Sequence, residues 1–231
     1  MGSGLTELFF REDRIGPAAE LFDASSWPHA IEPIVRVLKV SAPTIVLGSS
    51  QSFDVVDLDA CTSAGVDVVR RRSGGGAVWL DDDMLWVDVF VPTGHARWDA
   101  DIGRSTWWLG HAWADAVVSA GVAETVVHQG PMVRTEWSSL VCFAGLGAGE
   151  VTVGAAKVVG ISQRRTRSGA LFQCGVVRRW DPARLVGLLR LSHAGREAVM
   201  GATATAGHGL GRKADAALDA FVANLPTNCG M

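Results

Sequence analysis

Three consecutive glycines, Gly74, Gly75 and Gly76, follow the arginines at 70–72 and precede the apolar run 78–80. Glycine is costly inside a strand, because it loses the most backbone entropy on ordering and offers no side chain to pack. A triple glycine at the entrance to a strand therefore predicts that something approaches the backbone closely. Since arginines lie beside it, a ligand with negative charge or a phosphate is a natural candidate. A flexible turn beside a solvated basic patch fits the spacing equally well.

A lysine and a cysteine further along the chain could act on such a ligand. Lys157 is one of three lysines, against eighteen arginines, and lies among small residues in an apolar stretch. It could reach into a cleft and hold a carbonyl or phosphate oxygen, although a lysine that protects an edge strand fits the same pattern. Cys142 lies 15 residues earlier. As a thiolate near that lysine it would attack a thioester, whereas as a buried core cysteine it would be inert.

The other cysteines and the histidines indicate neither a disulfide framework nor a zinc site. The four cysteines, at 61, 142, 174 and 229, form no CxxC pair, and the six histidines are scattered. Four cysteines in a chain of 231 residues are typical of free thiols. Cys174 is the weaker candidate nucleophile. The acidic triplet at 81–83 could hold a metal, but the tip of a solvated turn explains it more simply, so no bound metal is expected.

The elements that must position these residues alternate irregularly along the chain. Periodicity and turn residues predict strands over 34–40, 44–48, 66–70, 75–80, 85–91, 125–127, 140–143, 151–153, 157–162 and 171–177. Helices are predicted within 17–30 and over 57–64, 102–120, 181–190, 193–204 and 212–223. Strands 75–80 and 85–91 should form a hairpin across the acidic triplet, and the tryptophans of the 102–120 helix should pack in the core. This order predicts an α+β fold with a mixed β-sheet flanked by helices.

Composition limits the class of protein. The chain is 48% apolar and 19% charged, which is typical of a globular protein, and we expect a single domain over 1–231. Its core should cover about residues 30–190, with the helices of 191–231 packed on it. A net charge of −3 argues against a general nucleic-acid binder. With no apolar stretch long enough for a bilayer and no secretion pattern at the N-terminus, we expect a cytoplasmic protein without a membrane partner.

Three segments in order, Pro43–Gln51, Arg71–Val78 and Lys157–Arg164, resemble motifs of the lipoate–protein ligase and octanoyltransferase catalytic domain, in the biotin/lipoate attachment superfamily. The resemblance covers about residues 35–180 and implies the mixed sheet and flanking helices of biotin and lipoate protein ligases. It implies that Lys157 contacts an activated acyl carbonyl or a phosphate linkage. It also implies that the acyl pocket is lined by Arg72, Ser73, Gly74, Gly75, Gly76 and Gly160.

The resemblance leaves three functions open. The first is a lipoate–protein ligase that uses ATP and Mg and joins a lipoyl or octanoyl group to a lysine of a lipoyl domain, in a 2-oxoacid dehydrogenase or a glycine-cleavage H-like protein. Certain family members carry a Cys-Phe pair before the lysine. Cys142-Phe143 therefore gives the second function, an octanoyltransferase or amidotransferase that forms an acyl-thioester and takes its donor from acyl carrier protein. The third is a catalytically silent acyl-binding module.

Departures from the family pattern bear on that choice. Ligases usually continue the glycine strand with a His-Asp pair, where this chain has Leu80-Asp81, and family members often have His-Gly where Gln173-Cys174-Gly175 stands. Many full ligases also carry an additional C-terminal domain, and we expect no such separate domain here. These differences argue against ATP-dependent adenylation. The Gly-rich run at 145–150 is interpreted as a flexible loop over the acyl pocket.

Overall fold

The structure is a computed structural model that describes residues 8–23, 32–225 and 227–228. Eight strands form a mixed sheet: β1 (Phe9–Gly16), β2 (Ile34–Val40), β6 (Met84–Pro92), β7 (Thr125–Val127), β8 (Val151–Val153), β9 (Ala156–Arg165), β10 (Gly169–Val177) and β11 (Thr227–Asn228). Their order is β11-β1-β2-β6-β10-β9-β8-β7. A second sheet, in the order β4-β3-β5, contains β3 (Thr44–Leu47), β4 (Asp67–Arg70) and β5 (Val78–Leu80).

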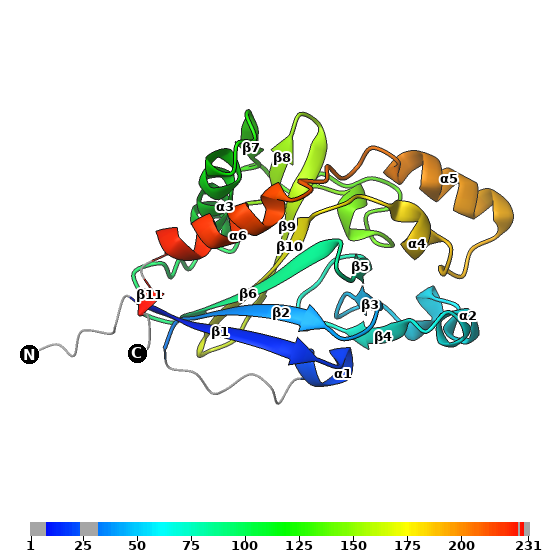
Figure 1. Cartoon of the computed structure of the whole chain (residues 1–231), viewed down its shortest axis with the longest axis horizontal. Helices are drawn as coiled ribbons and strands as arrows, with labels where there is room; N and C mark the ends of the chain where they lie inside the picture. The colour runs from blue at the N-terminus through cyan, green and yellow to red at the C-terminus, as the bar shows by residue number, and fades with distance from the viewer. Residues whose placement is uncertain (1–7, 24–31, 226, 229–231) are drawn as a thin grey trace, which may run out of the picture.

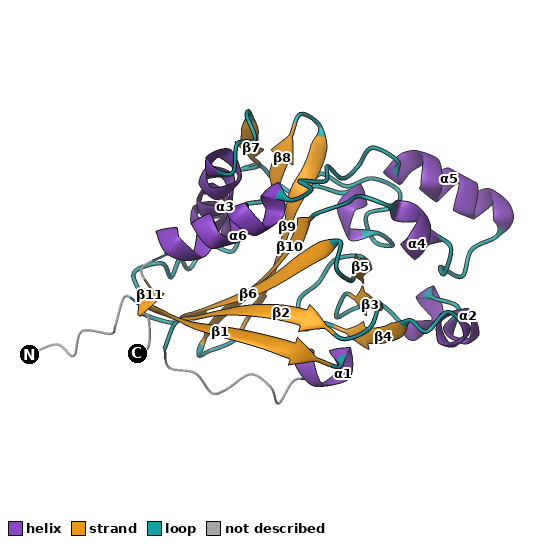
Figure 2. Cartoon of the chain, viewed as in Figure 1, coloured by secondary structure: helices purple, strands orange, loops and turns teal. Residues whose placement is uncertain are grey.

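Helices flank the sheets at two places (Figure 1). They are α1 (Ala18–Leu21), α2 (Leu58–Ser63), α3 (Trp107–Ser119), α4 (Pro182–Val186), α5 (His193–Thr203) and α6 (Lys213–Asn224). Helices α3 and α6 pack together over the eight-stranded sheet, whereas α2, α4 and α5 lie at the end that holds the small sheet (Figure 2). The predicted mixed sheet flanked by helices is confirmed.

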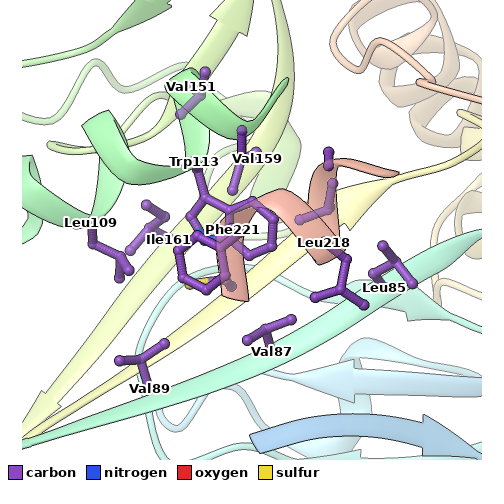
Figure 3. Packing of buried hydrophobic residues seen from close by; sticks show 14 of the residues in the cluster. Leu85, Val87, Val89, Leu109, Trp113, Val151, Val159, Ile161, Leu218 and Phe221 are labelled. Atoms are coloured by element: carbon purple, nitrogen blue, oxygen red, sulfur yellow. The ribbon is translucent and has the colours of Figure 1, made fainter. Parts of the chain in front are cut away.

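The largest core lies between the eight-stranded sheet and the pair α3 and α6 (Figure 3). Alternate residues of β6, among them Val87 and Val89, point into it because successive side chains of a strand face opposite sides of the sheet. Trp113 of α3 stacks on Phe221 of α6, with ring centroids 3.8 Å apart and an interplanar angle of 2°. The prediction that the tryptophans of this helix pack in the core is confirmed most fully for Trp113, which is completely buried.

Two predicted elements are wrong. Strand β5 pairs with β3, Val78 opposite Val46, while β6 lies between β2 and β10 in the other sheet, so the two predicted hairpin strands belong to different sheets. The predicted strand 140–143 is a single bridge between Val141 and Ala77, followed by a 3-10 helix at Cys142–Ala144. Its apolar residues are buried by tertiary contacts and have no neighbouring strand along their length. The sequence also missed β1, because its four consecutive charged residues at 11–14 interrupt the apolar alternation of a strand.

The acidic tip at 81–83 is a centre of ion pairs. Asp83 pairs with Arg179 at 2.6 Å and with Arg184 at 3.1 Å, and Asp81 also pairs with Arg184. These arginines follow β10 and begin α4, so the tip ties the turn after β5 to the region before the C-terminal helices. Part of the predicted helix within 17–30 is α1; residues 22–23 are not helical, and 24–30 lie outside the described residues. Among the helices that the structure describes, none has the length and apolar character needed to cross a bilayer.

Candidate active site

The triple-glycine arm, residues 71–77, leaves β4 and returns along the backbone of residues 140–142. The amide of Ala77 donates to the carbonyl of Leu140 at 2.8 Å, and the amide of Cys142 donates to the carbonyl of Ala77 at 3.0 Å. A Cβ atom on Gly76 would lie 2.6 Å from the Cys142 amide nitrogen. The close approach that the glycines predict is therefore present, and the approaching atoms are those of the chain segment that carries Cys142.

Arg71 fixes the shape of this arm from inside. Its side chain is buried, with 2% exposure. Nη2 donates to the carbonyls of Gly74 at 2.7 Å and Gly76 at 2.9 Å, Nη1 donates to Val46 at 3.1 Å, and Nε donates to Ser73 Oγ at 3.2 Å. Burial lowers the pKa of the guanidinium, and Cys142 and Glu150 act in the opposite direction.

Arg72, the arginine that the resemblance assigns to the acyl pocket, is half-buried. The structure places Arg71, its neighbour, along the inside of the glycine arm. A run of three arginines gives no local signal for which one turns inward. That choice depends on the direction in which the arm leaves β4.

Cys142 and Arg71 flank one point on the glycine arm. A Cβ atom built on Gly75 would lie 2.8 Å from Arg71 Nη2 and 3.6 Å from Cys142 Sγ. Gly75 also has a φ of +104°, a region that side chains other than glycine rarely adopt. The half-buried thiol of Cys142 thus faces a guanidinium across a position where no side chain fits.

A hollow of about 250 Å³ adjoins this thiol. Gly160 of β9 and Gly175 of β10 lie directly opposite each other, and Trp86 lies opposite Gly175 on β6. Because two neighbouring glycines leave a gap in the side-chain layer of the sheet, the hollow opens there. It is lined by Arg71, Val78, Trp86, Cys142, Phe143, Gly160, Ile161, Ser162, Gln173 and Gly175. The predicted site residues Cys142 and Gly160 therefore share one pocket, mostly apolar with a few polar groups at one side.

Lys157 reaches the same region from β9 through a buried ion pair. Its Nζ lies 2.6 Å from Glu150 Oε2 and donates to the carbonyl oxygen of Cys142 at 3.1 Å. The two side chains are only 3% and 5% exposed. The ammonium also lies 5.1 Å from the centre of the Phe143 ring. Lys157 therefore binds the turn that presents Cys142.

Glu150 is a site residue that the sequence analysis missed. It also accepts hydrogen bonds from the amides of Gly147 at 2.6 Å and Ile161 at 3.1 Å. The run 145–150, interpreted as a flexible loop, is held on its other side by two hydrogen bonds between Leu146 and Val133, at 2.8 and 3.0 Å. The segment is a loop, as interpreted, and it carries the partner of Lys157. The one feature of the sequence that could have pointed to Glu150 is its place as a single carboxylate between a glycine-rich run and an apolar strand.

Ser73 connects the glycine arm to the large sheet. Its Oγ donates to Gln173 Oε1 at 2.7 Å and lies 2.7 Å from Ser162 Oγ, and its amide donates to the same Gln173 oxygen at 3.2 Å. Gln173 and Ser162 are opposite each other on β10 and β9. Gln173 lies where family members often have histidine, and this difference is the feature of the sequence that pointed to it.

Cys174 is excluded as a nucleophile by its position. It is fully buried and belongs to the core between the sheet and helices α3 and α6. Burial raises the pKa of its thiol well above the ordinary value. Cys61 is also buried, and burial raises its pKa as well. Cys229 lies outside the described residues, so Cys142 is the half-buried thiol among the three cysteines that the structure describes.

A larger hollow of about 420 Å³ lies beyond Val78 and Phe143, which line both cavities. Its wall is largely apolar, and Asp83, Arg179 and Asp181 stand among its lining residues. No thiol or hydroxyl side chain is among its lining residues. The smaller hollow, where a thiol, a guanidinium and apolar side chains meet, is therefore the candidate active site.

Residues 20–204 match the family model of the lipoyl protein ligase A/B catalytic domain. The chain belongs to this family. Its members are lipoate ligases and octanoyltransferases, so this is an enzyme family. Octanoyltransferase LipM of Clostridioides difficile is 27% identical over 161 residues, which cover 69% of the chain and 59% of that protein. LipM of Moorella thermoacetica is 31% identical over 146 residues, which cover 63% and 53%. The chain thus spans little more than half the length of these relatives.

Solved structures show the same fold. A bipartite lipoate protein ligase of Thermoplasma acidophilum superposes with a TM-score of 0.70 at 17% identity, covering 96% of this chain and 85% of that one. Lipoate-protein ligase A bound with ATP superposes with a TM-score of 0.61 at 19% identity, covering 96% and 87%.

Proposed function

We propose that this protein is an octanoyltransferase that carries the acyl group on Cys142 and delivers it to a lysine of a lipoyl domain. The observation that carries the proposal is the position of the Cys142 thiol, half-buried, across Gly75 from the Arg71 guanidinium and at the wall of an apolar hollow. A positive charge beside a partly exposed thiol stabilises the thiolate, which is the reactive form. The LipM relatives support the same reaction class.

The reaction runs in two balanced steps. The Cys142 thiolate attacks the carbonyl carbon of an octanoyl thioester, and a carbon–sulfur bond to Cys142 forms. The carbon–sulfur bond to the donor breaks, and the donor leaves as a thiol after it takes up the proton that Cys142 lost. In the second step the neutral amine of the acceptor lysine attacks the acyl-cysteine. A carbon–nitrogen bond forms, the bond to Cys142 Sγ breaks, and the amine proton passes to the released thiolate.

The surrounding residues bind the acyl chain and stabilise the carbonyl oxygen. The acyl chain lies over Gly160 and Gly175, where the sheet lacks side chains, and the Trp86 ring forms one wall. An ammonium group has three N–H donors, and Lys157 uses two of them on Glu150 and the Cys142 carbonyl. We propose that the third contacts the carbonyl oxygen of the substrate, where it would stabilise developing negative charge.

The residues present fit an adenylating site poorly. Arg71 directs four of its five N–H donors to Val46, Ser73, Gly74 and Gly76, which leaves little for a phosphate. The carboxylate of Glu150 is engaged by Lys157 and two amides. A lipoate ligase that uses ATP and Mg is the second candidate, because the same fold occurs in a ligase bound with ATP.

The acceptor is the lipoyl domain of a 2-oxoacid dehydrogenase or of a glycine-cleavage H-like protein, and the donor is octanoyl acyl carrier protein. The archaeal lipoylation system with this fold pairs a lipoate protein ligase with its E2 lipoyl domain, which supports that class of acceptor. A thioester donor also matches the proposed chemistry, since thiolate–thioester exchange needs no nucleotide.

Intact mass spectrometry tests the proposal. The protein is incubated with octanoyl acyl carrier protein, first without an acceptor and then with a lipoyl domain. We expect one octanoyl group on the protein, removable by neutral hydroxylamine, and its transfer to the lipoyl domain on addition. Cys142→Ala should give neither product. Cys174→Ala is the matched control, because that thiol is buried in the core, and it should still become acylated.

The other functions give different results. Modification of the lipoyl domain by the Cys142→Ala variant with lipoate, ATP and Mg would establish the ligase and overturn the transferase. A wild-type protein that binds octanoate yet modifies no acceptor with either donor would be a silent acyl-binding module.

A further inference from the structure

One row of polar residues crosses five strands of the large sheet and ends at the active site. The strand register places Glu12 of β1 opposite Arg36 of β2, Arg36 opposite Asp88 of β6, Asp88 opposite Gln173 of β10, and Gln173 opposite Ser162 of β9. Residues directly opposite each other on neighbouring strands point to the same face. Five consecutive polar side chains across a buried sheet are costly unless each finds a partner. The row therefore calls for a reason beyond packing.

The contacts along the row give Gln173 a single orientation. Asp88 Oδ1 accepts hydrogen bonds from Trp86 Nε1 at 2.7 Å and from Gln173 Nε2 at 3.2 Å. Because the carboxylate takes the amide nitrogen, Oε1 of Gln173 points the other way, where it accepts from both the amide and the hydroxyl of Ser73. Ser73 Oγ in turn accepts a hydrogen bond from Arg71 Nε at 3.2 Å. The charge on Asp88 is thereby connected to the arginine beside Cys142.

We propose that Asp88 is a positioning residue of the active site, whose carboxylate fixes the Gln173 amide and, through Ser73, holds the glycine arm and Arg71 against Cys142. A protonated Asp88 would present an O–H donor, which pairs with the carbonyl end of an amide. Gln173 would then turn its NH₂ group toward Ser73, whose amide N–H needs an acceptor. The arm would lose two hydrogen bonds to the large sheet. This inference does not depend on which acyl donor is used. The expected effect of Asp88 on acyl transfer rests on the proposed role of Cys142.

The charged groups around Asp88 allow such a titration near neutral pH. Arg36 lies opposite on β2 and pairs with Glu12 at 2.7 Å, while Arg71 lies beyond Ser73. Cys174 is the neighbouring residue of β10 on the core face. Asp88 itself is 1% exposed, and burial raises its pKa to about 7, against the opposing effects of Trp86, Gln173 and Arg36.

Nuclear magnetic resonance observes this titration without any enzyme activity. The indole N–H of Trp86, assigned by its loss in Trp86→Phe, should shift with a midpoint near pH 7, and the Ser73 amide should shift with the same midpoint. Both shifts should vanish in Asp88→Asn. Asp82→Asn, which changes an exposed aspartate of the neighbouring turn, is the matched control and should leave them intact.

A variant at Gln173 tests whether the effect of Asp88 on Ser73 passes through the Gln173 amide. In Gln173→Leu the Trp86 resonance should still titrate, while the Ser73 amide should no longer follow it. The proposal is overturned if the Trp86 resonance is static from about pH 5 to about pH 9, or if Ser73 titrates unchanged in Gln173→Leu. Should Asp88→Asn fail to fold, the wild-type titration and Gln173→Leu still decide the question.

Transfer rates give the second readout. The transfer rate is measured against pH for both proteins, and the wild-type rate is divided by that of Asp88→Asn at each pH. The ratio should fall roughly tenfold between about pH 8 and about pH 6, because only about a tenth of a carboxylate is ionised one unit below its pKa. A flat ratio overturns the role of Asp88. Absence of transfer with every donor would instead overturn the proposed function and leave the resonance titration standing.

Discussion

Each glycine of the 74–76 run has its own surroundings at the residue scale. Gly74 has no atom within 4 Å of the position of a Cβ, Gly75 has a left-handed backbone beside Arg71 and Cys142, and Gly76 lies against the backbone of 141–142. Only the last two therefore require glycine. The run allows the arm that follows β4 to pack closely against the segment 141–142, and the Arg71 guanidinium and the Cys142 thiol lie on either side of Gly75.

A methyl group at these positions should consequently have unequal effects. Gly76→Ala would place Cβ 2.6 Å from the Cys142 amide nitrogen and push the cysteine segment away. We expect destabilisation of about 1–3 kcal/mol and, since a shift of about 1 Å can cost roughly 100-fold in rate, a comparable loss of acylation. Gly74→Ala, with open space around it, should change both quantities little. Urea denaturation and the rate of Cys142 acylation measure the two effects, and equal losses in both variants would contradict this account.

At the scale of elements, the packing of α3 against α6 forms one side of the largest core. The stacked rings of Trp113 and Phe221 join a helix from the middle of the chain to one near its end. They lie on the face of the large sheet that carries Val87 and Val89, whereas Trp86 and Gly160 line the hollow on the opposite face. The helix pair thus packs on the face of the sheet opposite the hollow.

Phe221→Ala should therefore separate stability from function. Removal of a fully buried aromatic ring leaves a cavity and costs about 3–5 kcal/mol of unfolding free energy, which thermal denaturation measures. Per folded molecule, acylation of Cys142 should be retained. Val118→Ala in α3, at a side chain that is half exposed, should change stability by no more than about 0.5 kcal/mol. An equal loss in both variants would contradict the packing assigned to α6.

At the scale of the whole molecule, the two sheets are joined by an apolar cluster and by a set of polar contacts. Ser73 leaves the small sheet and bonds to Gln173 and Ser162 of the large one, next to the buried carboxyl of Asp88. An ionised carboxylate in such a place is expensive, since burial disfavours the charged form. The arrangement that orders the active site therefore lowers the stability of the fold.

This cost predicts the pH dependence of unfolding. The pKa of Asp88 is raised from 3.8 to about 7 in the folded protein, so between these values the folded state binds more protons than the unfolded state. This group therefore lowers stability as pH rises from about 4 to about 7, by at most about 4 kcal/mol. Urea denaturation of the wild type and Asp88→Asn at about pH 5 and about pH 8 tests this. Asp88→Asn should lose the part of the decline that Asp88 causes, and identical pH dependence in both would contradict it.

The sequence by itself determined most of the elements and the residues that carry chemistry. Alternating apolar runs predicted β2, β9 and β10 within a few residues, because the period of a strand depends on local geometry. The glycine run, Lys157 and Cys142 stood out by residue type and order alone. Those signals are local or lie in a fixed order along the chain, so they can be found without coordinates.

Only the tertiary structure decided which residues face one another. It placed Arg71 inside the glycine arm, assigned β5 and β6 to different sheets, and joined Glu150 to Lys157. It also aligned five polar residues from five strands into one row. Such contacts depend on strand register and on the direction of loops, which are set by the packing of distant segments and leave no periodic trace in the sequence.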